Sequence, residues 1–203
     1  NGNHLLLFSL GETQGLRAEQ DIDSFFHVYN LESGDRIQSF GDREQILDSL
    51  SYSNGIAAAY TDHRIGSATL LSEYQMFYAP HVYGGILLEY RMDDDGIWQL
   101  FDKVSGTQLS RQAAIDFDFE DYMDNRQAYR EETPRNISAS MGSGINAAGI
   151  INYYSGGIYQ TPDNVIHFYI SEDEIEDAYR HTLHAELFDK NLTFLSSHKV
   201  YEG

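Results

Sequence analysis

The chain of 203 residues contains no cysteine. Disulfides, thiolate zinc sites and a cysteine nucleophile are therefore excluded outright, and stability has to come from packing. A chain of this length can bury most of its apolar surface in one core, so size alone does not demand cross-links.

Basic residues are also scarce. Lys and Arg number 13 against 32 Asp and Glu, the formal net charge is −19, and the only lysines are Lys103, Lys190 and Lys199. Binding to nucleic acid needs a cationic footprint that displaces counterions, and no stretch clusters enough basic residues to make one. We therefore expect no nucleic-acid partner. Few lysines with abundant Asp are typical of a secreted or salt-adapted surface, and equally of an ordinary acidic protein.

Long apolar runs are absent as well. No run approaches the roughly 18 apolar residues that a spanning helix needs, and the apolar start at residues 4–8 is short and lacks basic flanks. The sequence therefore predicts no membrane span.

Strand signals dominate what is present. The 15 Tyr and 11 Phe suit pleated, half-buried surfaces better than helices. Strands are predicted over residues 5–10, 24–30, 36–40, 56–60, 74–79, 86–92, 97–102, 150–154, 165–170, 183–188 and 192–196. Three short loop helices are predicted, after Asp42, over residues 119–132, and after Ser171, which forms a capping-box pattern with Glu174. The fold class is therefore mostly all-β.

One short phrase occurs twice, as Leu-Phe-Asp-Lys at residues 100–103 and again at 187–190. A looser third copy spans residues 28–37, with apolar alternation and a Ser-Gly corner. Hairpins that recur after tens of residues are typical of stacked or radially arranged β-units. We expect the two tetrapeptides to occupy equivalent places in successive four-stranded antiparallel blades.

No catalytic motif accompanies this repeat. The serine in Gly142-Ser143-Gly144 lacks the glycine two residues before it that a nucleophile elbow needs, because position 141 is Met. His181, His184 and Glu186 resemble scattered zinc ligands, but residues three apart in a strand face opposite sides. His63, His81 and His167 have no companion nearby in sequence. Tyrosines and Trp98 concentrated in two strand regions fit sugar-stacking platforms, and fit an aromatic core better (Tyr78, Tyr83, Tyr90, Tyr153, Tyr154 and Tyr159).

The one metal hypothesis concerns calcium. Asp116, Asp118 and Asp121 belong to an acidic run that offers the oxygen ligands calcium prefers, and alternation would place the first two on one face of a strand. The run lacks the glycine of an EF-hand loop, and dense acidic runs are usually solvated. Apart from calcium at these residues, no cofactor is expected.

Two segments resemble blade strands of the TolB-like β-propellers of bacterial envelope proteins. They are Tyr83-Gly84-Gly85-Ile86 leading to residues 88–90, and Gly156-Gly157-Ile158-Tyr159 leading to residues 163–169. The hairpins at residues 28–34 and 186–190 are similar to the outer-strand turns of that family. The resemblance carries no functional residue. It implies an extracytoplasmic domain, in the periplasm or at the cell surface, that binds partners and is usually non-catalytic.

The sequence thus predicts a single β-rich repeat domain over residues 1–203. Six blades of about 40 to 45 residues need more chain than this, so the copies amount to about four, as a partial or complete propeller or part of a larger one. We expect a binding or scaffolding module for a protein or glycan, acting through loops at one end of its sheets. Two alternatives stay open: a carbohydrate-active hydrolase with a carboxylate pair, whose spacing leaves no local pattern, and a β-sandwich with a calcium site.

Overall fold

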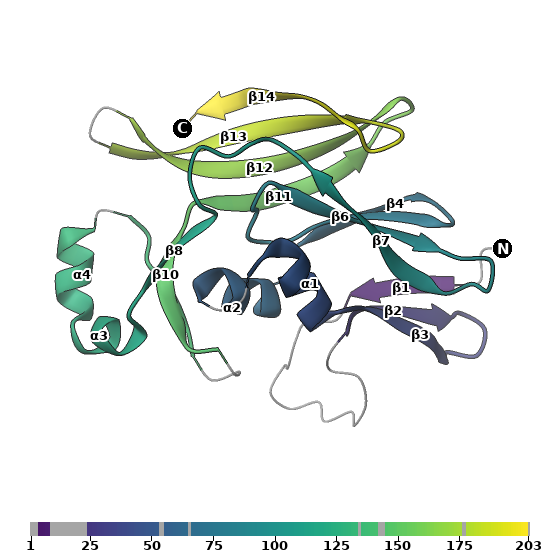
Figure 1. Ribbon diagram of the computed structural model, residues 1–203, viewed down its shortest axis with the longest axis horizontal. Coiled ribbons are helices and arrows are strands. Elements are labelled where there is room, and N and C mark those ends of the chain that lie inside the picture. Colours follow the sequence, from purple (N-terminus) through teal and green to yellow (C-terminus); the bar gives the residue numbers. More distant parts are fainter. Residues whose placement is uncertain are drawn as a thin grey trace.

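The computed structural model describes residues 4–8, 24–52, 55–64, 66–133, 135–141, 145–175 and 178–202. These residues are mostly β, as predicted, and form four antiparallel sheets with four short helices (Figure 1). Within these ranges, no helix has the length and apolar character needed to cross a membrane.

Two of the sheets have three strands and two have four. The first contains β1 (His4–Phe8), β2 (Ser24–Asn30) and β3 (Arg36–Asp42); the second β4 (Ser67–Ser72), β5 (Gln75–Ala79), β6 (Ile86–Met92) and β7 (Trp98–Ser105); the third β8 (Ala114–Phe117), β10 (Ala147–Ile151) and β9 (Ser138–Ser140); the fourth β11 (Tyr153–Gln160), β12 (Asn164–Ile175), β13 (Ala178–Asp189) and β14 (Phe194–Glu202). Both four-stranded sheets run in sequence order, so each is a simple meander.

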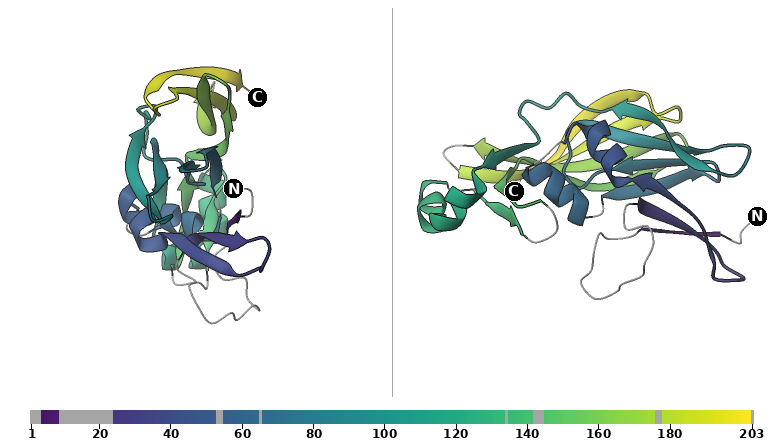
Figure 2. Two further views of the ribbon diagram at one scale, coloured as in Figure 1. Left: turned by 90° about the vertical axis from the view of Figure 1, so that its right-hand side faces the viewer. Right: turned by 60° about the horizontal axis from the view of Figure 1, so that its bottom comes forward.

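The sheet β4–β7 lies between β11–β14 and β1–β3 (Figure 1). A turn of 90° shows the same order, with β14 at the top and β2 and β3 at the bottom (Figure 2). Successive side chains of a strand point to opposite faces. In β5, Met76 and Tyr78 therefore join a core with β2 and β3, whereas Phe77 and Ala79 join a second core with β11–β14. β5 is thus buried on both faces and contributes side chains to both cores.

Helices cover the first core. α1 (Arg43–Leu50) begins where predicted, because the Asp42 side chain accepts the backbone N–H of Gln45 at 2.9 Å. Its Ile46 and Leu50 are buried in the core beside α2 (Ile56–His63). The predicted helix over residues 119–132 is present as α3 (Phe119–Asp124) and α4 (Arg126–Glu132).

The predicted strand over residues 150–154 is divided between β10 and β11, which belong to different sheets. Two further predicted elements are of the wrong type. Residues 56–60 form α2 instead of a strand, because three successive alanines favour a helix and Asp116 accepts the N–H of Ile56 at 2.6 Å. Residues 171–175, where the Ser171 capping box predicts a helix, belong to β12. They pair with residues 178–182 of β13 (Ala178–Asp189), and this pairing with a neighbouring strand overrides the local helix signal.

The two Leu-Phe-Asp-Lys copies do not occupy equivalent places, so that prediction is wrong. Residues 100–103 lie inside β7, the last strand of its sheet, and Phe101 is 55% exposed. Residues 187–189 end β13, the third strand of its sheet, and Phe188 is fully buried. The looser copy at residues 28–37 is the β2–β3 hairpin, as predicted. Among the described residues no closed propeller or barrel is present.

The corners that do match are the β6–β7 and β13–β14 hairpins. The Oδ1 atoms of Asp93 and Asp189 each accept the backbone N–H groups two and four residues further on, at 3.0 and 2.8 Å in the first corner and 2.9 and 2.8 Å in the second. The residue three further on has a positive φ in both, Gly96 at 82° and Leu192 at 62°. The two meanders therefore turn from third to fourth strand in the same way.

Candidate functional site

A hollow of about 550 Å³ lies at the hairpin ends of β2–β3, β4–β5 and β6–β7. We call it the hairpin pocket, and it is lined by His4, Val28, Ile37, Gln38, Leu70, Glu73, Tyr74, Met92, Gly96 and Trp98. Its volume is within the range of small-molecule and side-chain pockets, which are mostly apolar with a few polar groups. This lining has that character, with Glu73 and Gln38 among aliphatic and aromatic side chains.

The wall of the hairpin pocket is fixed by Trp98, the only tryptophan of the chain. Gln38 donates its amide N–H to the carbonyl of Trp98 and accepts the backbone N–H of the same residue, both at 3.2 Å. The indole stacks on Phe40 with ring centroids 5.4 Å apart. Backbone and ring of Trp98 are both held, so this part of the pocket wall is formed by contacts within the protein.

The rim of the hairpin pocket is apolar and acidic at once. Ile37, Leu70 and Tyr74 are each about half exposed, at 52%, 47% and 53%. Acidic residues stand at each of the three hairpins, with Glu32 and Asp35 in the first, Glu73 in the second and Asp93, Asp94 and Asp95 in the third. Glu73 raises the pKa of the Tyr74 hydroxyl, chiefly through a hydrogen bond. Among the described residues of these hairpins, the six carboxylates outnumber the adjacent cation, Arg36 at the start of β3, so the charge around the pocket mouth is negative.

The second polar region is the inner face of β11–β14. Alternation and register place these side chains on one face, which we call the polar face: Tyr153 and Ser155 from β11, His167, Tyr169, Ser171 and Asp173 from β12, Thr182, His184 and Glu186 from β13, and Ser197 and Lys199 from β14. At one end the face continues into Val165 and Phe188 of the second core. The face is thus apolar where β4–β7 covers it and polar beyond.

Glu186 and His167 are the buried centre of the polar face, and both have no exposed surface. The Tyr83 hydroxyl donates to the two carboxylate oxygens of Glu186 at 2.8 and 2.7 Å, and the backbone N–H of Thr107 donates at 2.5 Å. His167 Nδ1 lies 2.8 Å from the carboxylate. Burial alone would raise the pKa of Glu186, but the hydrogen bonds from His167 and Thr107 outweigh it and lower the pKa. Burial, and then Glu186, raises the pKa of Tyr83 well above 10.

The other ring nitrogen of His167 meets a serine. Nε2 lies 3.0 Å from Ser155 Oγ. Because the ionised carboxylate of Glu186 can only accept, Nδ1 carries a proton, and in the neutral form of the ring Nε2 presents its lone pair to the Ser155 hydroxyl. Ser155, His167 and Glu186 therefore form a serine, base and carboxylate in hydrogen-bond order.

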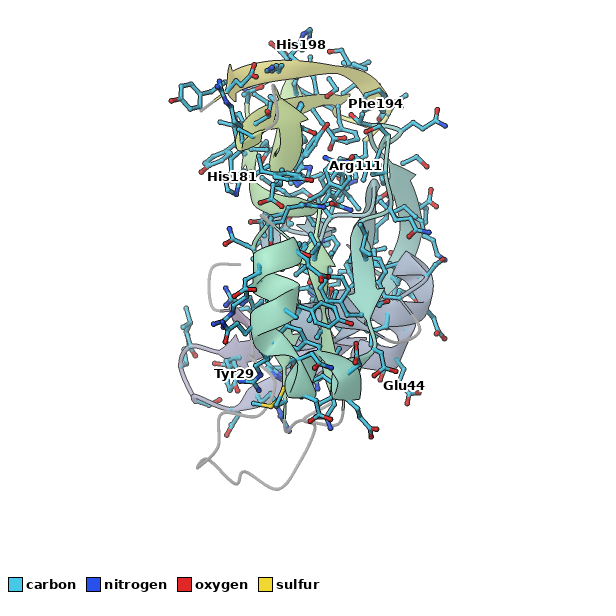
Figure 3. The ribbon with its side chains drawn as sticks, turned by 90° about the vertical axis from the view of Figure 1, so that its left-hand side faces the viewer. Tyr29, Glu44, Arg111, His181, Phe194 and His198 are labelled. Carbon is cyan, nitrogen blue, oxygen red and sulfur yellow. The ribbon has the colours of Figure 1, made fainter. Side chains whose placement is uncertain are left out.

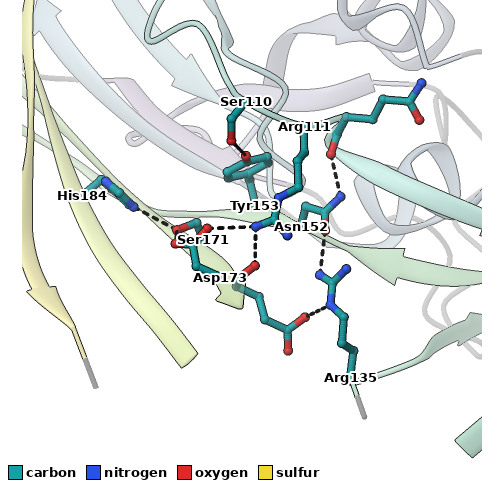
Figure 4. A network of polar contacts seen from close by, with 10 residues as sticks. Ser110, Arg111, Arg135, Asn152, Tyr153, Ser171, Asp173 and His184 are labelled. Atoms are coloured by element: carbon teal, nitrogen blue, oxygen red, sulfur yellow. Dashed lines mark hydrogen bonds and ion pairs between the residues drawn. The ribbon is translucent and has the colours of Figure 1, made fainter. Parts of the chain in front are cut away.

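A cleft of about 360 Å³ lies over the outer half of the polar face, under the loop at residues 107–110. Its walls include Tyr153, Tyr169, Asp173, His184 and Lys199. The His184 ring stacks on Tyr169 with centroids 4.6 Å apart. Burial lowers the pKa of His184. Figure 4 shows the polar contacts at the open end of this cleft.

Arginines fix that open end. Arg111 donates to Asp173 at 2.8 Å and to the carbonyl of Glu172 at 2.5 Å (Figure 4). Arg135 is paired with Glu172 at 2.7 Å and donates to Asn152 at 2.6 Å, and the Arg135 and Glu172 side chains are each only 7% exposed. Figure 3 looks at this end of the molecule and shows Arg111 between β14, marked by Phe194 and His198, and the lower part with Tyr29 and Glu44.

The three calcium candidates have separate structural partners. Asp116 Oδ1 accepts the N–H of Ile56, Asp118 caps α3 by accepting the N–H of Asp121, and Asp121 accepts from Asn125 and Tyr129. Asp118 follows the end of β8. The prediction that it shares a strand face with Asp116 is therefore wrong. Among the described residues no group of three or more His, Asp or Glu could hold a metal.

The remaining sequence candidates separate in the structure. His184 and Glu186 share the polar face, whereas His181 is on the opposite face of β13, as its spacing predicts. The core interpretation of the aromatic residues is confirmed for Tyr78, Tyr83, Tyr90, Tyr153 and Trp98, which are buried, while Tyr159 is 58% exposed. Gly142-Ser143-Gly144 lies outside the described residues.

Sequence reasoning did not bring Ser155, His167 and Tyr83 together. His167, Tyr169 and Ser171 alternate with apolar residues, and this period of two was a signal that they share one face. The partners from other strands depend on register, which the sequence does not contain. Comparison of the chain with protein-family models, with curated proteins and with solved structures found no match.

Proposed function

We propose that the protein is a binding module that holds a protein partner at the hairpin pocket. The observation that carries this proposal is the position of Trp98, held by Gln38 and Phe40 in the wall of a hollow of about 550 Å³. Large apolar anchors that fill preformed pockets supply most of the energy at protein interfaces. A preformed wall also reduces the ordering cost of binding.

The chemistry of the rim selects the partner. Exposed Ile37, Leu70 and Tyr74 offer apolar contact area around the opening. The acidic hairpins favour a partner whose apolar anchor is flanked by Lys or Arg, because complementary charge raises the association rate and rejects acidic competitors. A glycan is a poorer match for this site, because most of the lining is aliphatic or aromatic.

The alternatives from the sequence have less support. In the cleft over the polar face, Asp173 is the only carboxylate among the described lining residues, and it is paired with Arg111. A glycosidase needs two carboxylates across the scissile bond. The β-sandwich alternative requires two sheets, and the described residues form four.

A blade-like arrangement and a location outside the cytoplasm belong to the same proposal. Two observations support the blades. The β6–β7 and β13–β14 corners at Asp93 and Asp189 have matching hydrogen bonds. The first strands of the two meanders, β4 and β11, are in contact with each other. Support for the location is the resemblance of residues 83–90 and 156–169 to blade strands of envelope proteins.

The test uses Trp98 as an internal reporter. Peptides with a central Leu, Phe or Trp and flanking Lys and Arg are titrated against the full chain, with acidic-flanked peptides for comparison. We expect a shift of Trp98 emission that saturates, that favours the basic peptides and that weakens with salt. Leu70→Asp should abolish the shift, and the matched control Leu195→Asp, which changes a 50% exposed leucine on β14, should leave it unchanged. No saturable shift, or equal binding by the two variants, contradicts the proposal.

A further inference from the structure

The hydrogen-bond order at the centre of the polar face is the order of a serine hydrolase. Ser155 Oγ is 3.0 Å from His167 Nε2, and His167 Nδ1 is 2.8 Å from Glu186. A nucleophile, a base and a group that orients the base, each within hydrogen-bond reach of the next, characterise activated serines on unrelated folds. From this geometry we propose that the protein hydrolyses small acyl esters with Ser155 as nucleophile and His167 as general base.

The carboxylate of Glu186 accepts hydrogen bonds from several distant parts of the chain. Glu186 receives donors from three elements, namely Tyr83 before β6, Thr107 after β7 and His167 on β12. These donors keep it ionised, so it keeps the His167 ring in the tautomer whose Nε2 can take a proton. Glu186 is thus a positioning residue.

The neighbouring pair, Ser171 and His184, shows why this role falls to Ser155. Their Oγ and Nε2 atoms are 2.9 Å apart, a similar distance. The Ser171 hydroxyl, however, donates to Asp173, so its proton points away from the imidazole and His184 must act as the donor of the pair. In the described residues no carboxylate bonds to the other nitrogen of His184. The serine hydroxyl can therefore donate to the imidazole in the Ser155–His167 pair, whereas the imidazole donates to the serine in the Ser171–His184 pair.

Ser155 is placed where a ligand can approach. It is partly exposed and pairs with Tyr169, which pairs in turn with His184. Tyr169 and His184 line the cleft, so Ser155 lies beside the cleft without lining it. The next residues are Gly156 and Gly157, which add no side chain to the approach, and a register shift leaves Gly156 without a partner on β12. The cleft itself presents hydroxyls and the Lys199 amine, which suit an ester whose alcohol part is polar. His167 has no exposed surface, so we expect only a short acyl part to be accepted beside it.

The reaction balances as a two-step hydrolysis. Ser155 Oγ bonds to the ester carbonyl carbon while its proton passes to His167 Nε2, the bond from that carbon to the alcohol oxygen breaks, and the alcohol leaves with the proton from His167. Water then gives a proton to His167 and bonds to the acyl carbon. Ser155 leaves, takes that proton back, and releases a carboxylic acid.

The experiment combines covalent labelling with turnover. The full chain is incubated with a fluorophosphonate and the modified residue is located by mass spectrometry, and hydrolysis of p-nitrophenyl acetate and p-nitrophenyl octanoate is followed. We expect one label, on Ser155, and faster turnover of the acetate. Ser155→Ala should remove label and turnover, and His167→Gln should lower turnover by about 10²–10⁴-fold. The matched control is Ser196→Ala, which removes a serine 3.0 Å from His198 Nε2 that lines neither the cleft nor the hairpin pocket, and it should keep both. Glu186→Gln should lower kcat with little change in KM.

Labelling of the wild-type chain decides the outcome even where a variant fails to fold. Near-ultraviolet circular dichroism first shows that the wild-type and Ser155→Ala chains are folded. A label on any other residue, no label, or equal turnover by the wild-type and Ser155→Ala chains overturns the proposal. These outcomes are independent of the hairpin pocket, because no residue in this test lines it.

Discussion

Tyr83 donates its hydroxyl to both carboxylate oxygens of Glu186, 103 residues further along the chain. Neither residue has exposed surface. The bond joins the connection between β5 and β6 to β13, and so ties the central sheet to the sheet β11–β14 through a charge. Gly106 makes room for it, because a Cβ there would overlap the Tyr83 hydroxyl and lie 2.7 Å from Glu186 Oε1.

Removal of this hydroxyl is therefore expected to destabilise the fold. Tyr83→Phe leaves a buried, ionised carboxylate short of one donor, which costs about 1–3 kcal/mol and lowers Tm by about 2–10 °C. The matched control is Tyr90→Phe, because Tyr90 is equally buried and its hydroxyl has no hydrogen-bond partner among the described residues. That variant should be neutral or slightly more stable. Thermal unfolding of the two variants measures the difference, and equal losses would contradict this account of Tyr83.

The buried pair of Arg135 and Glu172 leads to a second prediction. Arg135→Met should cost about 3–5 kcal/mol, because it leaves the carboxylate of Glu172 buried without its cation. The double variant Arg135→Met with Glu172→Met should regain most of that loss, since no uncompensated charge is left. Denaturant unfolding of the two single variants and the double variant measures the coupling. Lys190→Met provides the exposed comparison, because its ion pair with Asp163 is 4.0 Å long and mostly solvated, and its loss should cost less than about 1 kcal/mol.

The sequence predicts most strands because their signals are local. β2 and β6 have the predicted bounds, because apolar residues fill most of both strands and turn residues such as Gly34 and Asp93 follow them. The β4 strand is missed because four of its six residues are Ser, Ala or Thr, and the strand pairs with β5. The hairpin match of Asp93 and Asp189 is also hidden, since Gly96 and Leu192 fill the same left-handed position with unlike residues.

The candidate sites are hidden for a related reason. Ser155, His167 and Glu186 come from three strands, and only the pairing register makes them neighbours. A shift of one residue would turn His167 to the opposite face of its sheet. The hairpin pocket depends in the same way on the packing of one sheet against another. Composition and spacing indicate the class of fold, whereas the sites depend on contacts between distant segments.

The pH dependence of stability should include a contribution from His81. Burial, and then Arg64, lowers the pKa of His81 from 6.5 to about 4. His81 therefore binds a proton below about pH 6.5 in the unfolded chain, but only below about pH 4 in the folded chain. The free energy of unfolding consequently falls as the pH drops from about 6.5 to about 4. His81→Gln should lose less stability than the wild type between pH 7.5 and 5. The matched control is His198→Gln, which changes an exposed histidine on β14 and should behave as the wild type. Burial also lowers the pKa of His184. His184 therefore makes stability fall with decreasing pH in the wild type and in both variants, so His81→Gln should remove only part of this dependence.

Calcium provides the last prediction. The carboxylates of Asp116, Asp118 and Asp121 already accept protein hydrogen bonds, and calcium would have to replace these bonds in order to gather six to eight oxygens. We therefore expect Tm to be the same with calcium at millimolar concentration and with a chelator. Asp118→Ala should still cost about 1 kcal/mol, because it removes the cap of α3, and its loss should not depend on calcium. A ligand that binds only the folded state raises Tm, and the rise grows with the logarithm of the ligand concentration once this exceeds Kd. An increase with calcium that disappears in Asp118→Ala would therefore show a metal site in this acidic run.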